Sequence, residues 1–365
     1  MKRILSVVGA RPNFMKVAPI HRAFAAYADT WRHEIVHTGQ HYDASMSDAF
    51  FSDLDMPQPA YFLGVGSGSH ATQSARIMEG FEQVCLDAKP DYVIVVGDVN
   101  STVACSLTSV KLGIRTAHVE AGLRSFDRAM PEEINRLATD AIVDDLFVTE
   151  ESGRQHLLHE GVSPERIFFV GNSMIDSLHY ALPKALLSDV LERVGVAPKQ
   201  YALVTLHRPS NVDDERQLRM LLDVLNAIAQ SMDVVFPVHP RTRKNFDLWS
   251  LKAEISPRIH LIDPVGYVDF LRLMQHSAFV LTDSGGIQEE TTALGVPCVT
   301  ARTTTERPVT VEIGTNVLVP PERDALINVC SEIVDRGLER PWRVPDLWDG
   351  HAAERIAAII TRHYS

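Results

Sequence analysis

Short apolar runs rich in β-branched residues alternate with longer stretches of helical periodicity along the chain. This alternation is typical of a doubly wound α/β protein built on a parallel sheet. In the first half it predicts strands at 4–8, 34–37, 92–96, 116–119, 146–148 and 167–170. The pattern begins again near residue 200 and predicts strands at 201–206, 234–238, 259–262, 279–282, 298–299 and 316–318.

A length of 365 residues fits two such domains. We expect an N-terminal Rossmann-like domain over 1–171 and a C-terminal one over 172–349. The helical stretch 174–196 forms the connection, and a final helix within 350–365 packs back on the first domain. Ligands of open α/β sheets bind at the carboxyl ends of the strands, so chemistry is expected in the loops that follow them.

The composition of the chain argues against several classes of function. The chain has 35 Lys plus Arg against 47 Asp plus Glu, a net charge of -12, which argues against nucleic-acid binding because that needs a basic footprint. The apolar run 4–8 that follows Met1-Lys2-Arg3 is too short for a signal peptide or a membrane span, so we expect a cytoplasmic protein without a membrane partner. The four cysteines are far apart and lack metal-ligand spacing, so no metal is expected.

Two common nucleotide motifs are absent. The chain has neither GxxxxGK[ST] nor a GxGxxG turn between strand and helix, so neither an ATP-type phosphate cradle nor a dinucleotide cofactor is indicated. The glycine-rich segment 64–68 follows a Pro-rich stretch rather than an opening strand. We interpret it as a flexible loop.

The segment 280–290 reads as a strand, a turn of small residues and a helix. Free amides at that helix start could receive a pyrophosphate, which Ser284, Gly285 and Gly286 would allow to approach closely. Glu290, one turn later, could accept hydrogen bonds from two ribose hydroxyls. An ordinary capped helix start explains the same residues equally well.

Basic residues follow the first strand of each half. Arg11 and Lys16 come after the first strand of the chain, and His207 with Arg208 after the first strand of the second half. They could bind phosphate. Plain surface charges and a structural histidine are the alternatives at such turns.

Carboxylates gather after the strands of the first half. Asp98, Glu120 and Glu132 stand in GDVNST, HVEAGLRS and MPEEINR. Each alone could cap a helix or pair with Arg124 or Arg136. Three acids at strand ends that face a ligand favour acid/base chemistry.

Together these motifs resemble one family, the bacterial non-hydrolysing UDP-N-acetylglucosamine 2-epimerases. The matching stretches span almost the whole chain: GARPNFMKVAP, HTGQHYD, GDVNST, HVEAGLRS, MPEEINR, GNSMIDSL, the His207-Arg208 turn, LTDSGGIQEE, TTERP and GTNVLV. The resemblance implies a glycosyltransferase-B-like fold of two Rossmann-like domains facing a cleft. It also implies a homodimer that binds a UDP-sugar and needs no cofactor.

The resemblance also implies roles for single residues. Asp98, Glu120, Glu132 and His207 would form the reacting centre, Glu290 would hold the ribose, and Phe270 would lie by the uracil. The diphosphate would be held by Arg11, Lys16, Ser284, Gly285 and Gly286, and the matching motifs add Arg136, Arg208 and Arg307 to the substrate-binding set.

The chain departs from the family pattern at three places. Asn13 and Val309 stand where many members have Glu, and neither position is assigned to chemistry. Some bacterial members have a regulatory second UDP-GlcNAc site that includes a Gln in the stretch after Gln40 and His41. This chain has 42–45 as Tyr-Asp-Ala-Ser there, which argues against substrate activation.

The implied reaction is reversible epimerisation of UDP-N-acetylglucosamine to UDP-N-acetylmannosamine, through anti elimination of UDP and its return to 2-acetamidoglucal, for surface polysaccharide precursors. Alternatives are a 2-epimerase of a related UDP-sugar such as UDP-2,3-diacetamido-glucuronic acid, a UDP-sugar-dependent glycosyltransferase, and a sugar-nucleotide sensor without catalysis. A hydrolysing epimerase is disfavoured because its GSRAEYG-like opening is replaced here by Gly-Ala-Arg-Pro at 9–12.

Overall fold

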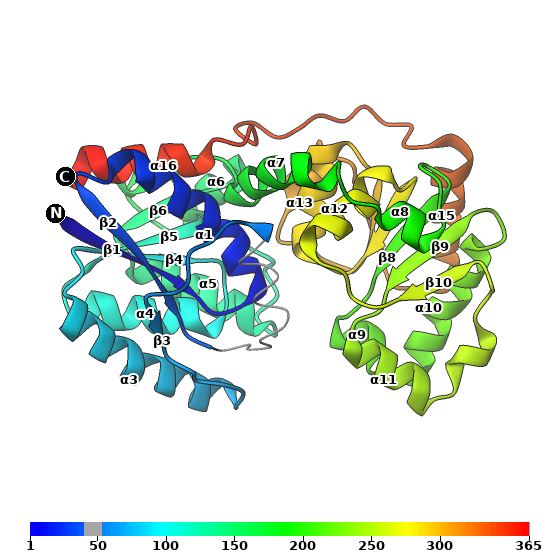
Figure 1. Ribbon diagram of the computed structural model, residues 1–365, viewed down its shortest axis with the longest axis horizontal. Coiled ribbons are helices and arrows are strands. Elements are labelled where there is room, and N and C mark those ends of the chain that lie inside the picture. Colours follow the sequence, from blue (N-terminus) through cyan, green and yellow to red (C-terminus); the bar gives the residue numbers. More distant parts are fainter. Residues whose placement is uncertain (40–52, 365) are drawn as a thin grey trace. The chain divides into compact units, whose positions relative to one another are not determined.

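The computed structural model describes residues 1–39 and 53–364 and divides the chain into two compact units (Figure 1). Unit 1 comprises Met1–Tyr180 and Asp346–Ser365, and unit 2 comprises Ala181–Pro345. The division falls inside helix α7, Ser173–Ala185, whereas the boundary expected from the sequence lies just before that helix. The first turns of α7 belong to unit 1 because the Ser177 hydroxyl there donates to the carbonyl of Met15.

Unit 1 is built on a seven-stranded parallel sheet with the order β3-β2-β1-β4-β5-β6-β7. Its strands are β1 Lys2–Val8, β2 Trp31–His37, β3 Tyr61–Phe62, β4 Tyr92–Val96, β5 Arg115–Ala121, β6 Asp145–Val148 and β7 Ile167–Phe169. Its helices are α1 Arg11–Phe24, α3 His70–Ala88, α4 Asn100–Lys111, α5 Pro131–Ile142, α6 Glu151–His159, α7, α16 Ala352–Tyr364, and the 3-10 turns Ala25–Tyr27 and Pro164–Arg166.

Helices cover both faces of this sheet, with α1 and α16 on one side and α3, α4 and α5 on the other (Figure 1). Helix α16 comes from the end of the chain and is fastened to unit 1 at its first turn. There the Asp176 carboxylate accepts the amides of Ala352 at 3.1 Å and Ala353 at 2.7 Å. Further along, the Trp31 indole donates to the Thr361 hydroxyl at 3.1 Å.

Unit 2 has a six-stranded parallel sheet with the order β10-β9-β8-β11-β12-β13. Its strands are β8 Tyr201–Thr205, β9 Asp233–Pro237, β10 Ile259–Ile262, β11 Phe279–Thr282, β12 Cys298–Ala301 and β13 Asn316–Val319. Its helices are α8 Val190–Val194, α9 Pro209–Val212, α10 Glu215–Ile228, α11 Pro240–Leu248, α12 Tyr267–His276, α13 Gly285–Leu294, α14 Pro308–Glu312, α15 Arg323–Arg336 and the 3-10 turn Leu251–Glu254.

Two apolar clusters lie against the two faces of the second sheet. One joins α10, α11 and α15 to the strands, and the other joins α8, α12 and α13 to them. The buried strand residues are almost continuously apolar, as expected for a parallel sheet covered on both faces.

All the predicted strands are present, but β3 was missed. It has only two residues, which pair with Val36 and His37 at the edge of the sheet, so it leaves no periodic signal. The 64–68 segment is a loop, but it does follow a strand, so that part of the interpretation was wrong. The predicted helical stretch 174–196 is interrupted between α7 and α8. None of the helices in the described residues has the length and apolar character to cross a membrane.

Candidate active site

A buried ion pair lies at the carboxyl ends of the central strands of unit 1. The Lys16 ammonium, on α1, is 2.6 Å from Oε2 of Glu120 at the end of β5. Each residue is only 3% exposed. Lys16 was expected at the diphosphate, and in this structure its charge is matched by one of the expected catalytic acids.

An irregularity in β5 determines where Glu120 points. Side chains alternate along a strand, so His118 and Glu120 would share one face of the sheet. Instead His118 bonds Asp140 on α5, and Glu120 pairs with Lys16 on α1, on the opposite side. The register shifts between Val119 and Ala121, and Glu120 has a φ of 76°, the left-handed region. This bulge turns the carboxylate toward α1, and such strain is commonly retained at functional sites.

The loop after β4 lies beside the same ion pair. Gly97 has a φ of 66°, and a Cβ at this position would lie 3.1 Å from Nζ of Lys16 and 3.9 Å from Oε1 of Glu120. Glycine therefore allows the loop to approach the ion pair. Asp98 follows directly, and its carboxylate oxygen Oδ2 is 2.6 Å from Nη2 of Arg136.

Helix α5 carries two adjacent glutamates with different surroundings. Glu133 is buried; it accepts hydrogen bonds from the Ser125 amide and hydroxyl, and it pairs with Nη1 of Arg136 at 2.7 Å. Glu132 lies half-buried in the first turn of the helix. Arg136 thus connects Asp98 to Glu133 in this structure.

In unit 2, His207 after β8 is held by Asp283 after β11. The buried Asp283 carboxylate accepts the amides of His207 at 3.0 Å and Arg208 at 2.9 Å, and one of its oxygens is 3.1 Å from Nδ1 of His207. Burial raises the pKa of Asp283, but the hydrogen bonds and charge of its partners lower it more, below its usual value. An ionised Asp283 fixes Nδ1 as the donor and leaves Nε2 of the half-exposed imidazole for chemistry.

The turn at Ser284 and Gly285 packs closely against the side chains of Glu306 and Arg307, as its small residues allow. Ser284 is the N-cap of α13, yet its hydroxyl makes no capping hydrogen bond. A Cβ on Gly285 would lie 2.7 Å from Oε1 of Glu306 and 3.1 Å from Nη1 of Arg307. Arg307 itself is buried and pairs with Glu306 at 2.7 Å and Glu289 at 2.9 Å, so its position is fixed beside the turn.

Glu290 and Phe270 belong to the same unit. Glu290 is buried on α13, where its Oε1 accepts a hydrogen bond from the Tyr267 hydroxyl at 2.8 Å. Burial raises the pKa of Glu290 to about 7, against the lowering effect of the Tyr267 hydrogen bond. Phe270, on the same helix as Tyr267, is half-buried against the cluster of α8, α12 and α13.

The structure therefore groups the expected residues in two sets. Lys16, Glu120, Asp98 and Arg136 gather at the strand ends of unit 1, and His207, Arg208, Ser284, Gly285 and Arg307 gather at those of unit 2. Asp283 and Tyr267 were missed. Asp283 directly precedes Ser284 in the predicted turn, which could have identified it, whereas Tyr267 gives no signal of its own.

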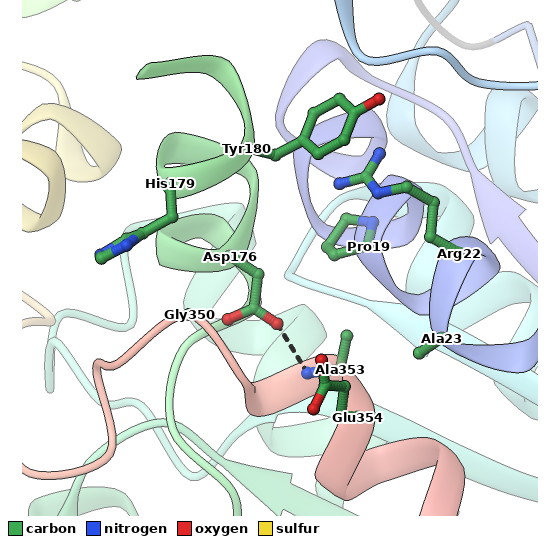
Figure 2. Close-up of a pocket in the computed structure, with 9 residues that line it drawn as sticks. All are labelled: Pro19, Arg22, Ala23, Asp176, His179, Tyr180, Gly350, Ala353 and Glu354. Atoms are coloured by element: carbon green, nitrogen blue, oxygen red, sulfur yellow. Dashed lines mark hydrogen bonds between the residues drawn. The ribbon is translucent and has the colours of Figure 1, made fainter. Parts of the chain in front are cut away.

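Two of the expectations concern parts of the chain that the structure does not describe. Arg11 is the first residue of α1, but its side chain is outside what the structure describes, as are the residues of the 40–45 stretch. A pocket between α1, α7 and α16 is lined by Arg22, Asp176, His179 and Tyr180, and none of the expected site residues lines it (Figure 2). Across residues 1–39 and 53–364, no group of three or more His, Cys, Asp or Glu side chains could hold a metal ion.

Comparison with known proteins assigns the family. A family model described as UDP-N-acetylglucosamine 2-epimerase matches residues 25–361. The chain belongs to this family, whose members of that name are isomerases. The two parallel-sheet units and this membership confirm the expected glycosyltransferase-B-like fold class.

Individual relatives cover nearly the whole chain. The UDP-N-acetylglucosamine 2-epimerase of Methanocaldococcus jannaschii is 41% identical, over 97% of this chain and 98% of the relative. Its crystal structure in complex with UDP-GlcNAc and UDP has a TM-score of 0.89, covering 99% of this chain and 100% of that one. The UDP-2,3-diacetamido-2,3-dideoxy-D-glucuronate 2-epimerase of Pseudomonas aeruginosa is 39% identical, over 99% of each chain.

Proposed function

We propose that this protein is a non-hydrolysing epimerase that interconverts UDP-N-acetylglucosamine and UDP-N-acetylmannosamine. The proposal rests on one observation in this family member. Nζ of Lys16 and Oε2 of Glu120 form a buried ion pair, 2.6 Å apart, at the strand ends beside the Asp98 loop. Glu120 has a strained backbone, and the Asp98 carboxylate is held by Arg136. Both carboxylates therefore have fixed positions, which suits them to proton transfer.

The chemistry explains why such acids are needed. The hydrogen on C2 of a 2-acetamido sugar is not adjacent to a carbonyl carbon, so its removal needs help from a leaving group. A carboxylate takes the C2 proton as the C1–O bond breaks, and the electron pair of that bond leaves with UDP. The product is 2-acetamidoglucal. UDP oxygen then reattacks C1, and C2 receives a proton on the opposite face.

The proposed catalytic residues have two tasks, transfer of the C2 proton and assistance to the departing UDP. Asp98, Glu120 and Glu132 form the proton-handling set, and Lys16 is the cation beside Glu120. His207, oriented by Asp283, assists the departure of UDP. A donor aimed where negative charge develops lowers the barrier of such a step.

The nucleotide is held mainly by unit 2. The start of α13 at Ser284, Gly285 and Gly286 offers its backbone amides to the diphosphate. The Ser284 hydroxyl, which makes no capping hydrogen bond, is a further donor, and Arg11 is a further cation. Glu290 accepts from the ribose, and Phe270 lies by the uracil. Arg136, Arg208 and Arg307 complete the substrate-binding set.

A second substrate has specific support. The Pseudomonas aeruginosa relative, at 39% identity, is named for UDP-2,3-diacetamido-2,3-dideoxy-D-glucuronate. The elimination involves only C1 and C2, so both sugars can follow the same route with the same residues. What differs is recognition at C3 and C6.

One experiment tests both candidates. Each UDP-sugar is incubated with the protein in heavy water, and the anomeric proton signals and the C2 hydrogen are followed by NMR. Elimination and return predict the manno epimer with deuterium at C2 of the product. An unchanged sugar after prolonged incubation with both substrates refutes the proposed function, and an epimer that retains its C2 hydrogen refutes the mechanism.

We also propose that the protein acts as a cytoplasmic homodimer, as the family resemblance implies. Light scattering coupled to gel filtration measures the assembly. A mass of about one chain of 40.6 kDa, at micromolar concentration, would rule the dimer out.

A further inference from the structure

A buried chain of charged groups lies behind the strand ends that carry Asp98 and Glu120. His118 on β5 is fully buried; its Nδ1 is 2.6 Å from Oδ1 of Asp140, and its Nε2 is 2.7 Å from the carbonyl oxygen of Gly97. The other Asp140 oxygen accepts the Gly122 amide at 3.0 Å and lies 2.7 Å from Nη1 of Arg124.

The hydrogen-bond partners of His118 determine its protons. A backbone carbonyl oxygen can only accept, so Nε2 must carry a hydrogen. An ionised carboxylate can also only accept, so Nδ1 must carry a hydrogen too. Independently of His118, the Asp140 carboxylate accepts the Gly122 amide at 3.0 Å and pairs with Arg124 at 2.7 Å, contacts that favour its ionised form.

We propose that His118 is an imidazolium in the folded protein, donating from both ring nitrogens, and that it positions the Gly97–Asp98 loop for proton transfer. The inference rests on the proposed function for its catalytic consequence, while the protonation follows from the contacts alone. His118 touches no reacting atom, so it is a positioning residue.

Charge balance supports a buried imidazolium. The groups facing His118 and its partner are Asp140 on α5, Arg124 after β5 and, through Arg124, Glu160 at the end of α6, at 2.7 Å. With His118 charged, the row alternates in sign and sums to zero. With His118 neutral, it would hold one negative charge in excess, most of it out of contact with water, which is costly.

The His118 imidazolium holds the carboxyl ends of the neighbouring strands β4 and β5. Its Nε2 holds the carbonyl of Gly97, directly before Asp98, while the Gly97 amide donates to the Val119 carbonyl at 3.1 Å, directly before Glu120. Asp140 in turn holds the Gly122 amide beyond Glu120. The His118–Asp140 pair therefore holds the backbone next to both proposed acids, Asp98 and Glu120.

The protonation is tested by NMR on the whole protein with ¹⁵N-labelled histidine. The His118 signals are assigned from their loss in His118→Gln. We expect both ring nitrogens to show the shifts of N–H groups at pH 7, because each faces an acceptor. A non-protonated nitrogen on His118 at pH 7 overturns the proposal, and this result does not depend on whether the protein is an epimerase.

Two variants test the positioning role. A Gln amide nitrogen mimics Nε2 and can keep the bond to Gly97, whereas an Asn amide nitrogen mimics Nδ1 and can keep only the bond to Asp140. We expect His118→Asn to lower kcat about 100-fold with KM little changed, because the Asp98 loop shifts, and His118→Gln to lose about tenfold or less.

The control variant is His351→Gln, on the surface at the start of α16. Thermal unfolding is measured for all three variants. If kcat of the Asn and Gln variants falls equally, or follows only their loss of thermal stability, His118 is structural and the positioning role is wrong. Failure of the proposed function itself would appear instead as an inactive wild-type protein.

Discussion

The Tyr267 hydroxyl and the Glu290 carboxyl form a buried pair, with 2.8 Å between the hydroxyl oxygen and Oε1. Burial raises the pKa of Glu290 from 4.5 to about 7, so the carboxyl changes its charge near neutral pH. In the unfolded chain the same group ionises near its ordinary value. The free energy of unfolding must therefore depend on pH through this residue.

The sign follows from the raised pKa. The folded protein holds the Glu290 proton more tightly than the unfolded chain, so this contribution to stability is complete below pH 4.5 and is lost as pH rises through about 7. We expect wild type to lose about 3 kcal/mol relative to Glu290→Gln between pH 4.5 and pH 8.5. Urea unfolding at several pH values measures it. Glu192→Gln, on the exposed side of α8, should track wild type, and parallel curves for wild type and Glu290→Gln would contradict the assignment.

The Lys16–Glu120 pair should show strong energetic coupling. Lys16→Met leaves the Glu120 carboxylate buried without its ammonium, which costs about 3 to 5 kcal/mol. The double variant Lys16→Met with Glu120→Gln removes both charges and should recover part of that stability. Unfolding free energies of the two single variants and the double variant complete the cycle. Additive losses would show that the two side chains do not interact.

Gly285→Ala should weaken UDP binding. The added Cβ would come within 2.7 Å of Oε1 of Glu306 and 3.1 Å of Nη1 of Arg307, and must displace that ion pair or the turn. Losing one good hydrogen bond to the diphosphate costs roughly 1.5 to 3 kcal/mol, a tenfold or greater loss of affinity. Calorimetry with UDP measures it. Gly80→Ala in α3 is the control, because its Cβ makes an ordinary 3.5 Å contact with Leu63. Equal affinities would place the diphosphate elsewhere.

Asp98→Asn should separate catalysis from binding. The amide keeps the shape of the side chain but cannot carry a proton as a carboxylate does, so kcat should fall about 10²- to 10⁴-fold. UDP affinity should remain, because the diphosphate is assigned to other residues. Asp91→Asn is a matched control at the amino end of the same strand, where Asp91 accepts the Arg3 amide at 2.7 Å. Normal turnover of Asp98→Asn would remove Asp98 from the proton-handling set.

Much of the fold could be predicted because a parallel sheet covered by helices leaves continuous apolar runs. Strands such as β4, with five buried residues, were found at their observed limits. The short edge strand β3 was not, because two residues cannot show periodicity. The limit of helix α7 was also hidden, because helical residues continue into α8 with only a short break.

The site was predicted as a set of strand-end residues, but not as a set of contacts. Period-two alternation puts His118 and Glu120 on one face, and the bulge that separates them has no signal in HVEAG. Lys16 was expected to bind phosphate as a turn cation, yet its partner comes from a strand more than a hundred residues away. Such pairings depend on tertiary packing, which local patterns do not encode.

The fastening of α16 on unit 1 has a consequence for biosynthesis. Asp176 caps the helix that begins at Ala352, and Trp31 bonds Thr361, so the first unit lacks α16 until residues 352–364 have left the ribosome. Unit 2, Ala181–Pro345, is by then already translated in full. Domains generally fold in the order of their synthesis. Here the unit that starts first is completed last, so the nascent chain must keep the α1 surface uncovered while the whole second unit is made.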